Sequence, residues 1–317
     1  MLEVCVSRKI IEAEGVCSFE LKSLDGAQLP AFTAGAHIDV HVAPGLTRQY
    51  SICNAPQERE RYVIAVLHEP ESRGGSRGMH TTVAEGSLIS IGSPRNLFEL
   101  DLTGDRYLLF AGGIGITPIL AMAHTLLATG KDFELHYCGR SIERLAFLDA
   151  LNQSPYKEHL HVHLNNGHPS QALDAEKILA HPSRGDQLYC CGPLGFMSHI
   201  ENTARAQGWD DPQIHREDFA AKPQMVEGDS SFEIELRQSG QVFEVPADKT
   251  VLEVLLENGI EIESSCEQGI CGACITRVVE GTPDHRDQYM IASEHSQNNC
   301  FTPCCSRAHS KRLVLDL

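Results

Sequence analysis

The chain has 317 residues, of which 42% are hydrophobic and 22% are charged, and its formal net charge is -17 at pH 7. At about 150 residues per domain, this length predicts two or three folding units. Nucleic acids and anionic membranes attract basic surfaces, so the acidic charge argues against both as partners. We find neither an apolar run of about 18 residues nor the features of a signal peptide, and we therefore expect a cytoplasmic protein.

Residues 1–103 show the short alternating patterns of an antiparallel barrel or sandwich. Apolar and polar residues alternate in several runs that are separated by turns. The expected strands are Cys5–Ile11, His37–Val42, Gln49–Cys53, Tyr62–Leu67 and Leu88–Ile91.

Residues 104–222 change to apolar strands that alternate with helices, which is typical of an α/β domain with a parallel sheet. We expect helices at Thr117–Thr129, after Ser141, around Asp174–Ala180 and after Pro193. The expected strands are Tyr107–Ala111, Phe133–Cys138, His159–Leu164 and Gln187–Cys191.

A polar stretch with proline and glycine follows, and we interpret residues 223–230 as an interdomain linker. Residues 231–317 are then expected to form a small α+β domain. Phe232–Leu236 and Val242–Val245 flank a Ser-Gly pair as a hairpin, and Thr250–Asn258 is expected to be a helix that Gly259 ends.

The strongest motif lies in this last domain. Cys266, Cys271 and Cys274 have the spacing C-x4-C-x2-C, and Cys304 follows after a long interval. This is the spacing of plant-type [2Fe-2S] ligands, and soft anionic thiolates are the donors that such a cluster requires. We expect Cys304 to approach the cluster from a strand, while the adjacent Cys305 is the alternative fourth ligand.

Two glycines, Gly269 and Gly272, lie between these cysteines and would let main-chain N–H groups approach the cluster sulfurs. A zinc site or a set of reduced cysteines is the alternative. Structural zinc normally takes paired C-x2-4-C motifs, so the asymmetric run favours the iron–sulfur cluster.

A glycine-rich turn follows the expected strand Tyr107–Ala111. Gly112, Gly113 and Gly115 would let the backbone approach a pyrophosphate at the start of the next helix. An ordinary turn is the alternative, because the third glycine of G-x-G-x-x-G is absent. No acidic residue ends the second strand either, where the sequence CGRS stands instead.

In the first domain, the sequence RQYS at residues 48–51 places a cation, an aromatic ring and a hydroxyl on one short strand. These groups suit a phosphate, ring stacking and a hydrogen bond to a ring. Taken alone, the segment also fits an ordinary barrel strand.

Taken in order along the chain, RQYS, AGGIGITP, CGP, HREDF, CEQGICGAC and the ending CCSRAHSKRLVLDL resemble the phthalate dioxygenase reductase family. The segments PDHRDQYM and FTPCCSRA are most similar to its vanillate O-demethylase branch. The resemblance implies a ferredoxin-reductase-like antiparallel β-barrel for flavin, an α/β parallel-sheet nucleotide domain and a C-terminal β-grasp plant-type ferredoxin domain.

The resemblance also implies which residues bind each cofactor. Those implied for FMN are Arg48, Tyr50, Ser51, Ala65, Val66, Leu67, Gly74, Gly75 and Ser76. Those implied for the nicotinamide nucleotide are Gly112, Gly113, Gly115, Thr117, Pro118, Arg140, Ser141, Cys191, Gly192 and Pro193. Cys191 would lie near the nicotinamide ring, Phe219 would cover the flavin, and Ser51, Cys191 and Phe219 are the expected catalytic residues.

The implied function is that of an NADH-dependent oxidoreductase. FMN would accept a hydride, and the [2Fe-2S] cluster would pass single electrons to a terminal oxygenase of the Rieske non-haem iron type. The alternatives are a reductase for another acceptor, such as a different Rieske oxygenase or a cytochrome P450, and a redox sensor without turnover. Arg140 and Ser141 would also suit a 2'-phosphate, so NADPH stays open as the donor, as do the partner's substrate and the oligomeric state.

Three histidines of the second domain form a further candidate metal site. His159, His161 and His163 alternate on one expected strand, so their imidazoles would share a face. A solvated outer face is the favoured interpretation, because no further ligand group is evident.

Overall fold

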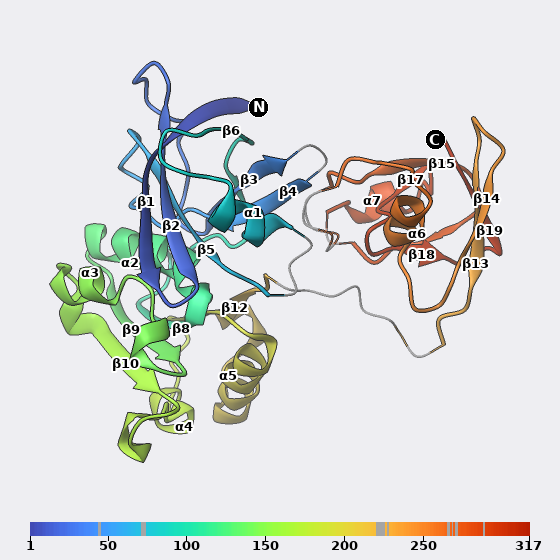
Figure 1. The fold of residues 1–317 in the computed structure, drawn as a ribbon. Helices are drawn as coiled ribbons and strands as arrows, with labels where there is room; N and C mark the ends of the chain where they lie inside the picture. Colours follow the sequence, from blue (N-terminus) through green and yellow to red (C-terminus); the bar gives the residue numbers. More distant parts are fainter. Residues whose placement is uncertain are drawn as a thin grey trace. The chain divides into compact units, whose positions relative to one another are not determined.

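A computed structural model describes residues 1–43, 46–70, 74–219, 226, 228–264, 267, 269, 272–287 and 289–317 (Figure 1). The chain divides into two compact units. Unit 1 contains Met1–Val42 and Gln49–Phe219, and unit 2 contains Ala43–Arg48 and Ala220–Leu317. The domain boundaries at residues 103/104, 222/223 and 230/231 stay predictions.

The N-terminal part of the chain forms an antiparallel barrel. Its strands follow the order β4-β3-β6-β1-β2-β5, and β7 pairs with β3. A bridge between Ile52 and Ile64 links the end of β4 to β5, and the N–H of Cys53 donates to the carbonyl of Val63 at 2.8 Å. The strands are β1 (Leu2–Ala13), β2 (Val16–Ser23), β3 (Ala36–Ala43), β4 (Leu46–Ser51), β5 (Tyr62–Leu67), β6 (Leu88–Ile91) and β7 (Arg95–Asn96), and the helix is α1 (Gly75–Thr81).

The rest of unit 1 contains a fully parallel sheet of the order β10-β9-β8-β11-β12. From β8 the sheet grows to one side through β9 and β10, and the chain then crosses to the other side of β8 to form β11 and β12. The C-terminal ends of β8 and β11 therefore form a topological switch point, which is where open α/β sheets bind ligands. The strands are β8 (Arg106–Gly112), β9 (Asp132–Gly139), β10 (Leu160–Leu164), β11 (Asp186–Cys191) and β12 (Ile214–Glu217).

Helices cover both faces of this sheet. Successive side chains of a strand point to opposite faces, and in β8 the apolar side chains on both faces are buried. Leu109 packs in one buried core, whereas its neighbours Leu108 and Phe110 pack in another. The α-helices are α2 (Ile116–Ala128), α3 (Leu148–Gln153), α4 (Ala175–Ile178) and α5 (Leu194–Gln207). The 3-10 helices are η1 (Gly113–Gly115), η2 (Ile142–Arg144), η3 (Lys157–His159), η4 (Pro169–Gln171) and η5 (Asp211–Gln213).

Unit 2 contains a mixed sheet of the order β14-β13-β19-β15-β17, together with a small β16-β18 pair. β13 and β19 are parallel, and the other pairs are antiparallel. The strands are β13 (Phe232–Leu236), β14 (Val242–Val245), β15 (Thr276–Glu280), β16 (Pro283–Asp284), β17 (Cys300–Phe301), β18 (Arg307–Ala308) and β19 (Arg312–Leu315), and the helices are α6 (Val251–Glu257) and α7 (Ala292–His295).

Helix α6 begins where the sequence predicts it. The hydroxyl of Thr250 accepts from the N–H of Glu253 at 3.1 Å, and the carboxylate of Glu253 accepts from the N–H of Thr250 at 2.8 Å. This reciprocal capping box satisfies two N–H groups at the start of the helix. Within the described residues, we find no helix with the length and apolar character needed to cross a membrane.

Candidate redox site

Two loops meet closely at the switch point of the parallel sheet. A Cβ atom on Gly115 would lie 2.1 Å from the carbonyl oxygen of Cys191, and one on Gly192 would lie 2.9 Å from the Cα of Gly112. Glycine is therefore required for the two backbones to approach this closely. At Gly113 the φ angle is +55° and a Cβ would meet open space among the described residues, so this turn has room for a ligand.

The other residues predicted for the nucleotide lie at the same edge of the sheet. Thr117 is buried at the start of α2, where its hydroxyl donates to the carbonyl of Ile114 at 2.9 Å, and Pro118 follows it. Pro193 precedes α5, after Gly192. Arg140 and Ser141 follow the end of β9, with Arg140 exposed and Ser141 partly buried.

Cys191 is the last residue of β11 and is fully buried. Burial raises the pKa of its thiol well above the usual range, with a smaller contribution from the charge of Glu217. Cys191 is therefore a neutral thiol at physiological pH. It can pack against a bound ring but does not offer a nucleophilic thiolate.

Ser51 of β4 and Glu217 of β12 come together in unit 1. The Ser51 Oγ and Glu217 Oε2 atoms are shielded from solvent, and neither has a hydrogen-bond partner of ordinary geometry among the described residues. Burial raises the pKa of Glu217 to about 8, while the Ser51 hydroxyl lowers it by a smaller amount. Two shielded polar groups without such partners fit a site that is completed by a polar ligand.

Glu217 is not among the residues predicted from the sequence, although the motif HREDF contains it. Nothing in the sequence shows that this carboxylate is shielded, because the shielding comes from the folded unit. Two residues later, Phe219 is 40% exposed, and its place over the flavin stays a prediction.

The remaining residues predicted for FMN lie on β4, β5 and the start of α1. Arg48 and Tyr50 share β4 with Ser51, and Ala65, Val66 and Leu67 end β5. Gly74 has a φ of +105° and precedes Gly75 and Ser76 of α1. The imidazole Nε2 of His80 in α1 lies 2.8 Å from the carbonyl oxygen of Val66, which connects α1 to β5.

In unit 2, Cys274 and Cys304 are buried in one small cluster with Leu252 and Cys305. Cys266 and Cys271 lie outside the described residues. Gly269 and Gly272 have φ angles of +76° and +72°, in the left-handed region that favours glycine. The buried thiols and the glycine-rich loop fit a thiolate-bound iron–sulfur cluster.

The position of Cys304 corrects one expectation. It lies in the turn between β17 and β18 and not on a strand, because the chain turns at residues 303–305. The Sγ of Cys305 lies 3.2 Å from the hydroxyl oxygen of Thr302 and 3.8 Å from that of Ser306. The choice of Cys304 over Cys305 as the fourth ligand stays a prediction.

The histidines of the parallel sheet differ from the expected solvated face. His159 lies in η3, before β10, and His161 is exposed, but His163 is partly buried. The His163 Nε2 lies 3.1 Å from the Nδ1 of His136 in β9, and burial lowers the pKa of His163 to about 4. These residues do not form a group of converging metal ligands in the described part of the chain.

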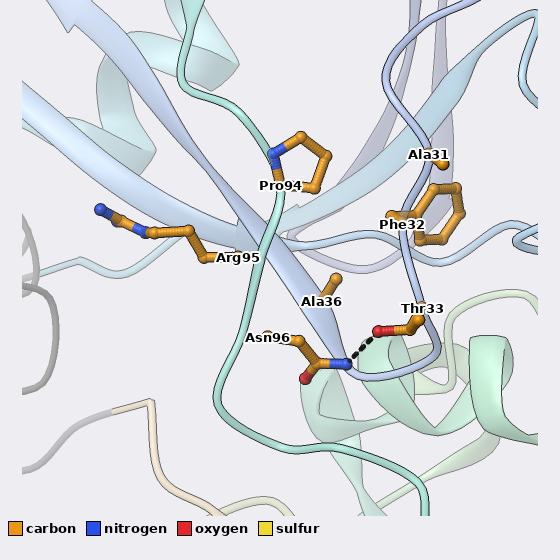
Figure 2. Close-up of a pocket in the computed structure, with 7 residues that line it drawn as sticks. All are labelled: Ala31, Phe32, Thr33, Ala36, Pro94, Arg95 and Asn96. Carbon is orange, nitrogen blue, oxygen red and sulfur yellow. Dashed lines mark hydrogen bonds between the residues drawn. The ribbon is translucent and has the colours of Figure 1, made fainter.

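A separate pocket opens on the barrel, as Figure 2 shows. The Nδ2 of Asn96 donates to Thr33 Oγ1 at 2.7 Å, and Arg95 pairs with Asp39 at 2.7 Å. None of the predicted site residues lines this pocket, whose walls are Ala31, Phe32, Thr33, Ala36, Pro94, Arg95 and Asn96.

Comparison with known proteins identifies the last domain and the whole chain. Residues 234–309 match the family described as the 2Fe-2S iron-sulfur cluster binding domain. The solved structure of phthalate dioxygenase reductase, described as a modular structure for electron transfer from pyridine nucleotides to [2Fe-2S], is 38% identical. The match covers 100% of this chain and 98% of that structure's chain, and the TM-score is 0.76. The chain belongs to the phthalate dioxygenase reductase family.

Other relatives refine its place in the phthalate dioxygenase reductase family. The vanillate O-demethylase oxidoreductase of Pseudomonas putida is 52% identical, with 100% of both chains covered. An intact type IV self-sufficient cytochrome P450 monooxygenase is 38% identical with a TM-score of 0.77, and the chain spans 41% of it. The predicted family, its vanillate O-demethylase branch and the three-part fold are confirmed.

Proposed function

We propose that the protein is the NADH-dependent reductase component of an oxygenase system. Electrons pass from NADH through FMN and a [2Fe-2S] cluster to a separate terminal oxygenase. That partner is of the Rieske non-haem iron type and acts on an aromatic acid such as vanillate, and the system works in the cytoplasm. The full-length similarity to the vanillate O-demethylase oxidoreductase supports this choice of partner.

The observation that carries the proposal is that one chain contains both a nucleotide-type switch point and a [2Fe-2S] domain. The close approach of Gly115 to Cys191 and the shielded pair of Ser51 and Glu217 lie in unit 1. The buried cysteines Cys274 and Cys304 lie in unit 2. This combination fits a protein that takes two electrons from NADH together and passes them on one at a time.

The chain's own residues bind and orient the reactants. The Gly112–Gly115 turn receives the pyrophosphate of NADH, and β4, β5 and the start of α1 hold FMN. When bound, FMN takes a hydride from NADH and the cluster carries electrons singly. Glu217, with a pKa of about 8, holds a proton at neutral pH beside the Ser51 hydroxyl. Both groups can therefore donate a hydrogen bond to the flavin ring.

Absorption spectroscopy and two acceptors test the proposal. One equivalent of NADH, added anaerobically, should bleach the flavin and iron–sulfur bands together, and FMN should be the flavin released on denaturation. Cys304→Ser should abolish electron transfer to the oxygenase but leave NADH-to-ferricyanide reduction through the flavin. Cys300→Ser, in the same unit, is the matched control and should keep both activities. Equal loss of both activities in Cys304→Ser would contradict separate flavin and cluster sites.

A second candidate is a reductase for a cytochrome P450. The observation in its favour is the likeness to the reductase part of the self-sufficient cytochrome P450 monooxygenase. Steady-state assays with purified Rieske and cytochrome P450 acceptors distinguish the two. The second candidate requires faster reduction of the cytochrome P450. A redox sensor without turnover is ruled out if NADH reduces ferricyanide continuously.

A further inference from the structure

Three side chains outside the redox site converge in unit 2. His285 follows β16, His295 ends α7, and Asp287 lies between them in the chain. One ligand atom from each residue lies within 4.8 Å of the other two. The two imidazole rings are stacked with centroids 4.4 Å apart. Two histidines and one carboxylate are a common ligand set for divalent transition metals.

His285 has a ring nitrogen without a hydrogen-bond partner among the described residues. Its side chain is 10% exposed, and its Nδ1 atom is buried without a hydrogen bond in the described part of the chain. The Nε2 atom lies 3.3 Å from the amide oxygen of Asn298. In the tautomer with the proton on Nε2, this N–H donates to the Asn298 oxygen and the Nδ1 lone pair is left for a metal ion. Metal-binding histidines are held in the same way by an outer hydrogen bond.

Asp287 brings a buried negative charge. Its side chain is 0% exposed, and its Oδ2 accepts from the N–H of Met290 at 2.8 Å. Its Oδ1 lies 3.1 Å from His295 Nε2 and 3.9 Å from His285 Nδ1. The neighbouring Arg286 donates instead to Asp229 at 2.9 Å and to Asp284 at 2.8 Å. Across the described residues, the ion-pair partners of Asp287 are these two histidines alone, and a buried carboxylate favours a compensating cation.

We propose that His285 Nδ1, Asp287 Oδ1 and His295 Nε2 bind one divalent transition-metal ion of the zinc type. Tetrahedral ligands at about 2.0–2.1 Å from zinc lie about 3.3 Å from one another. The Asp287 Oδ1 atom lies 3.1 Å from His295 Nε2 and 3.9 Å from His285 Nδ1, and the three ligand atoms lie within 4.8 Å of one another, so they must draw closer around the ion. The two imidazole rings must also turn out of their stacked arrangement, because a metal ion lies in the plane of each ring that binds it. His295 is 28% exposed, which gives the ion an entry path and leaves the fourth position for water.

The site lies beside Gly269. A Cβ on Gly269 would be 3.0 Å from Asp287 Cα and 3.1 Å from its Cβ. Zinc added to the protein can also displace iron from thiolates, so iron content and visible absorption must be followed together with zinc binding. This control separates the proposed site from damage to the cluster.

Equilibrium dialysis of the holoprotein against Zn²⁺, with both metals counted, tests the site. We expect one zinc per chain with full iron retention, and at least tenfold weaker binding in His295→Gln. His309→Gln is the matched control, because His309 is in the same unit, is exposed and lies 3.6 Å from Asp284. This control should bind zinc as the natural protein does. Equal affinity in His295→Gln, or zinc uptake only with loss of iron, would overturn the proposal.

Asn298→Gly tests the role of His285 without removing a ligand. Asn298 has a φ of +51°, which glycine adopts without strain. Loss of its amide oxygen frees the His285 ring, so zinc binding should weaken by about 10–100-fold. Unchanged affinity in this variant would exclude His285 as an oriented ligand. In both variants, retained iron–sulfur absorption confirms that unit 2 has folded.

Discussion

Replacement of Glu217 by glutamine tests the physical basis of the redox site. Burial raises the pKa of Glu217 from 4.5 to about 8. Between these values the folded protein keeps a proton that the unfolded chain has released, so stability falls as the pH rises. Glutamine has the same size and never ionises. The variant should therefore gain stability over the natural protein as the pH increases.

The expected magnitude follows from the linkage between pKa and stability. Each pH unit between the two pKa values changes the free energy of unfolding by about 1.4 kcal/mol. The advantage of Glu217→Gln should be under about 1 kcal/mol at pH 5 and about 3 kcal/mol at pH 7. The residue as a whole is partly exposed, but the Oε2 atom that carries the charge is shielded, so we regard these values as upper limits.

Urea unfolding followed by fluorescence gives the measurement, because Trp209 is the single tryptophan and is buried in unit 1. Both proteins are compared from pH 5 to pH 8 at saturating FMN. Glu176→Gln replaces an exposed acidic residue of α4 and is the matched control for the loss of one negative charge. A difference between Glu217→Gln and the natural protein that does not change with pH would refute the raised pKa.

Three further predictions concern other parts of the chain. In Gly115→Ala, the added Cβ atom would overlap the carbonyl oxygen of Cys191. The variant should oxidise NADH at least tenfold more slowly in stopped-flow measurements, and urea unfolding should show that unit 1 is less stable by about 1–3 kcal/mol. Cys305→Ser should keep the iron–sulfur absorption that Cys304→Ser loses; loss in both would contradict the ligand assignment. The Arg286 guanidinium lowers the pKa of Asp229 to about 2, so this carboxylate is ionised at both pH 5 and pH 8. Asp229→Asn should therefore lower the free energy of unfolding by about 1–2 kcal/mol equally at the two pH values. A loss of stability that appears only at pH 8 would argue against this ion pair.

The sequence predicted those strands that have a regular pattern. β5 and β6 have the predicted bounds, and the helix α2 differs by one residue at each end. β2 was not predicted, because the first six of its eight residues are buried, and a strand that is buried on both faces has no alternation to detect. The helix α1 was missed because it contains two glycines, which are poor helix formers.

The site was predicted where a motif has a fixed spacing and was missed where folding brings distant residues together. The spacing that includes Cys274 identified the cluster domain. Glu217 and Ser51 are far apart in the sequence, and only the burial of their oxygens marks them. His285 and His295 match no common ligand spacing, so their convergence on Asp287 required the fold.

The pairing of β13 with β19 has a consequence for biosynthesis. These two parallel strands are neighbours in the sheet, but they begin 80 residues apart, at Phe232 and Arg312. β19 also lies between β13 and β15, so the sheet is incomplete until Arg312–Leu315 has left the ribosome. Contacts between distant segments form slowly. Insertion of the iron–sulfur cluster into this domain should therefore follow the emergence of β19 from the ribosome.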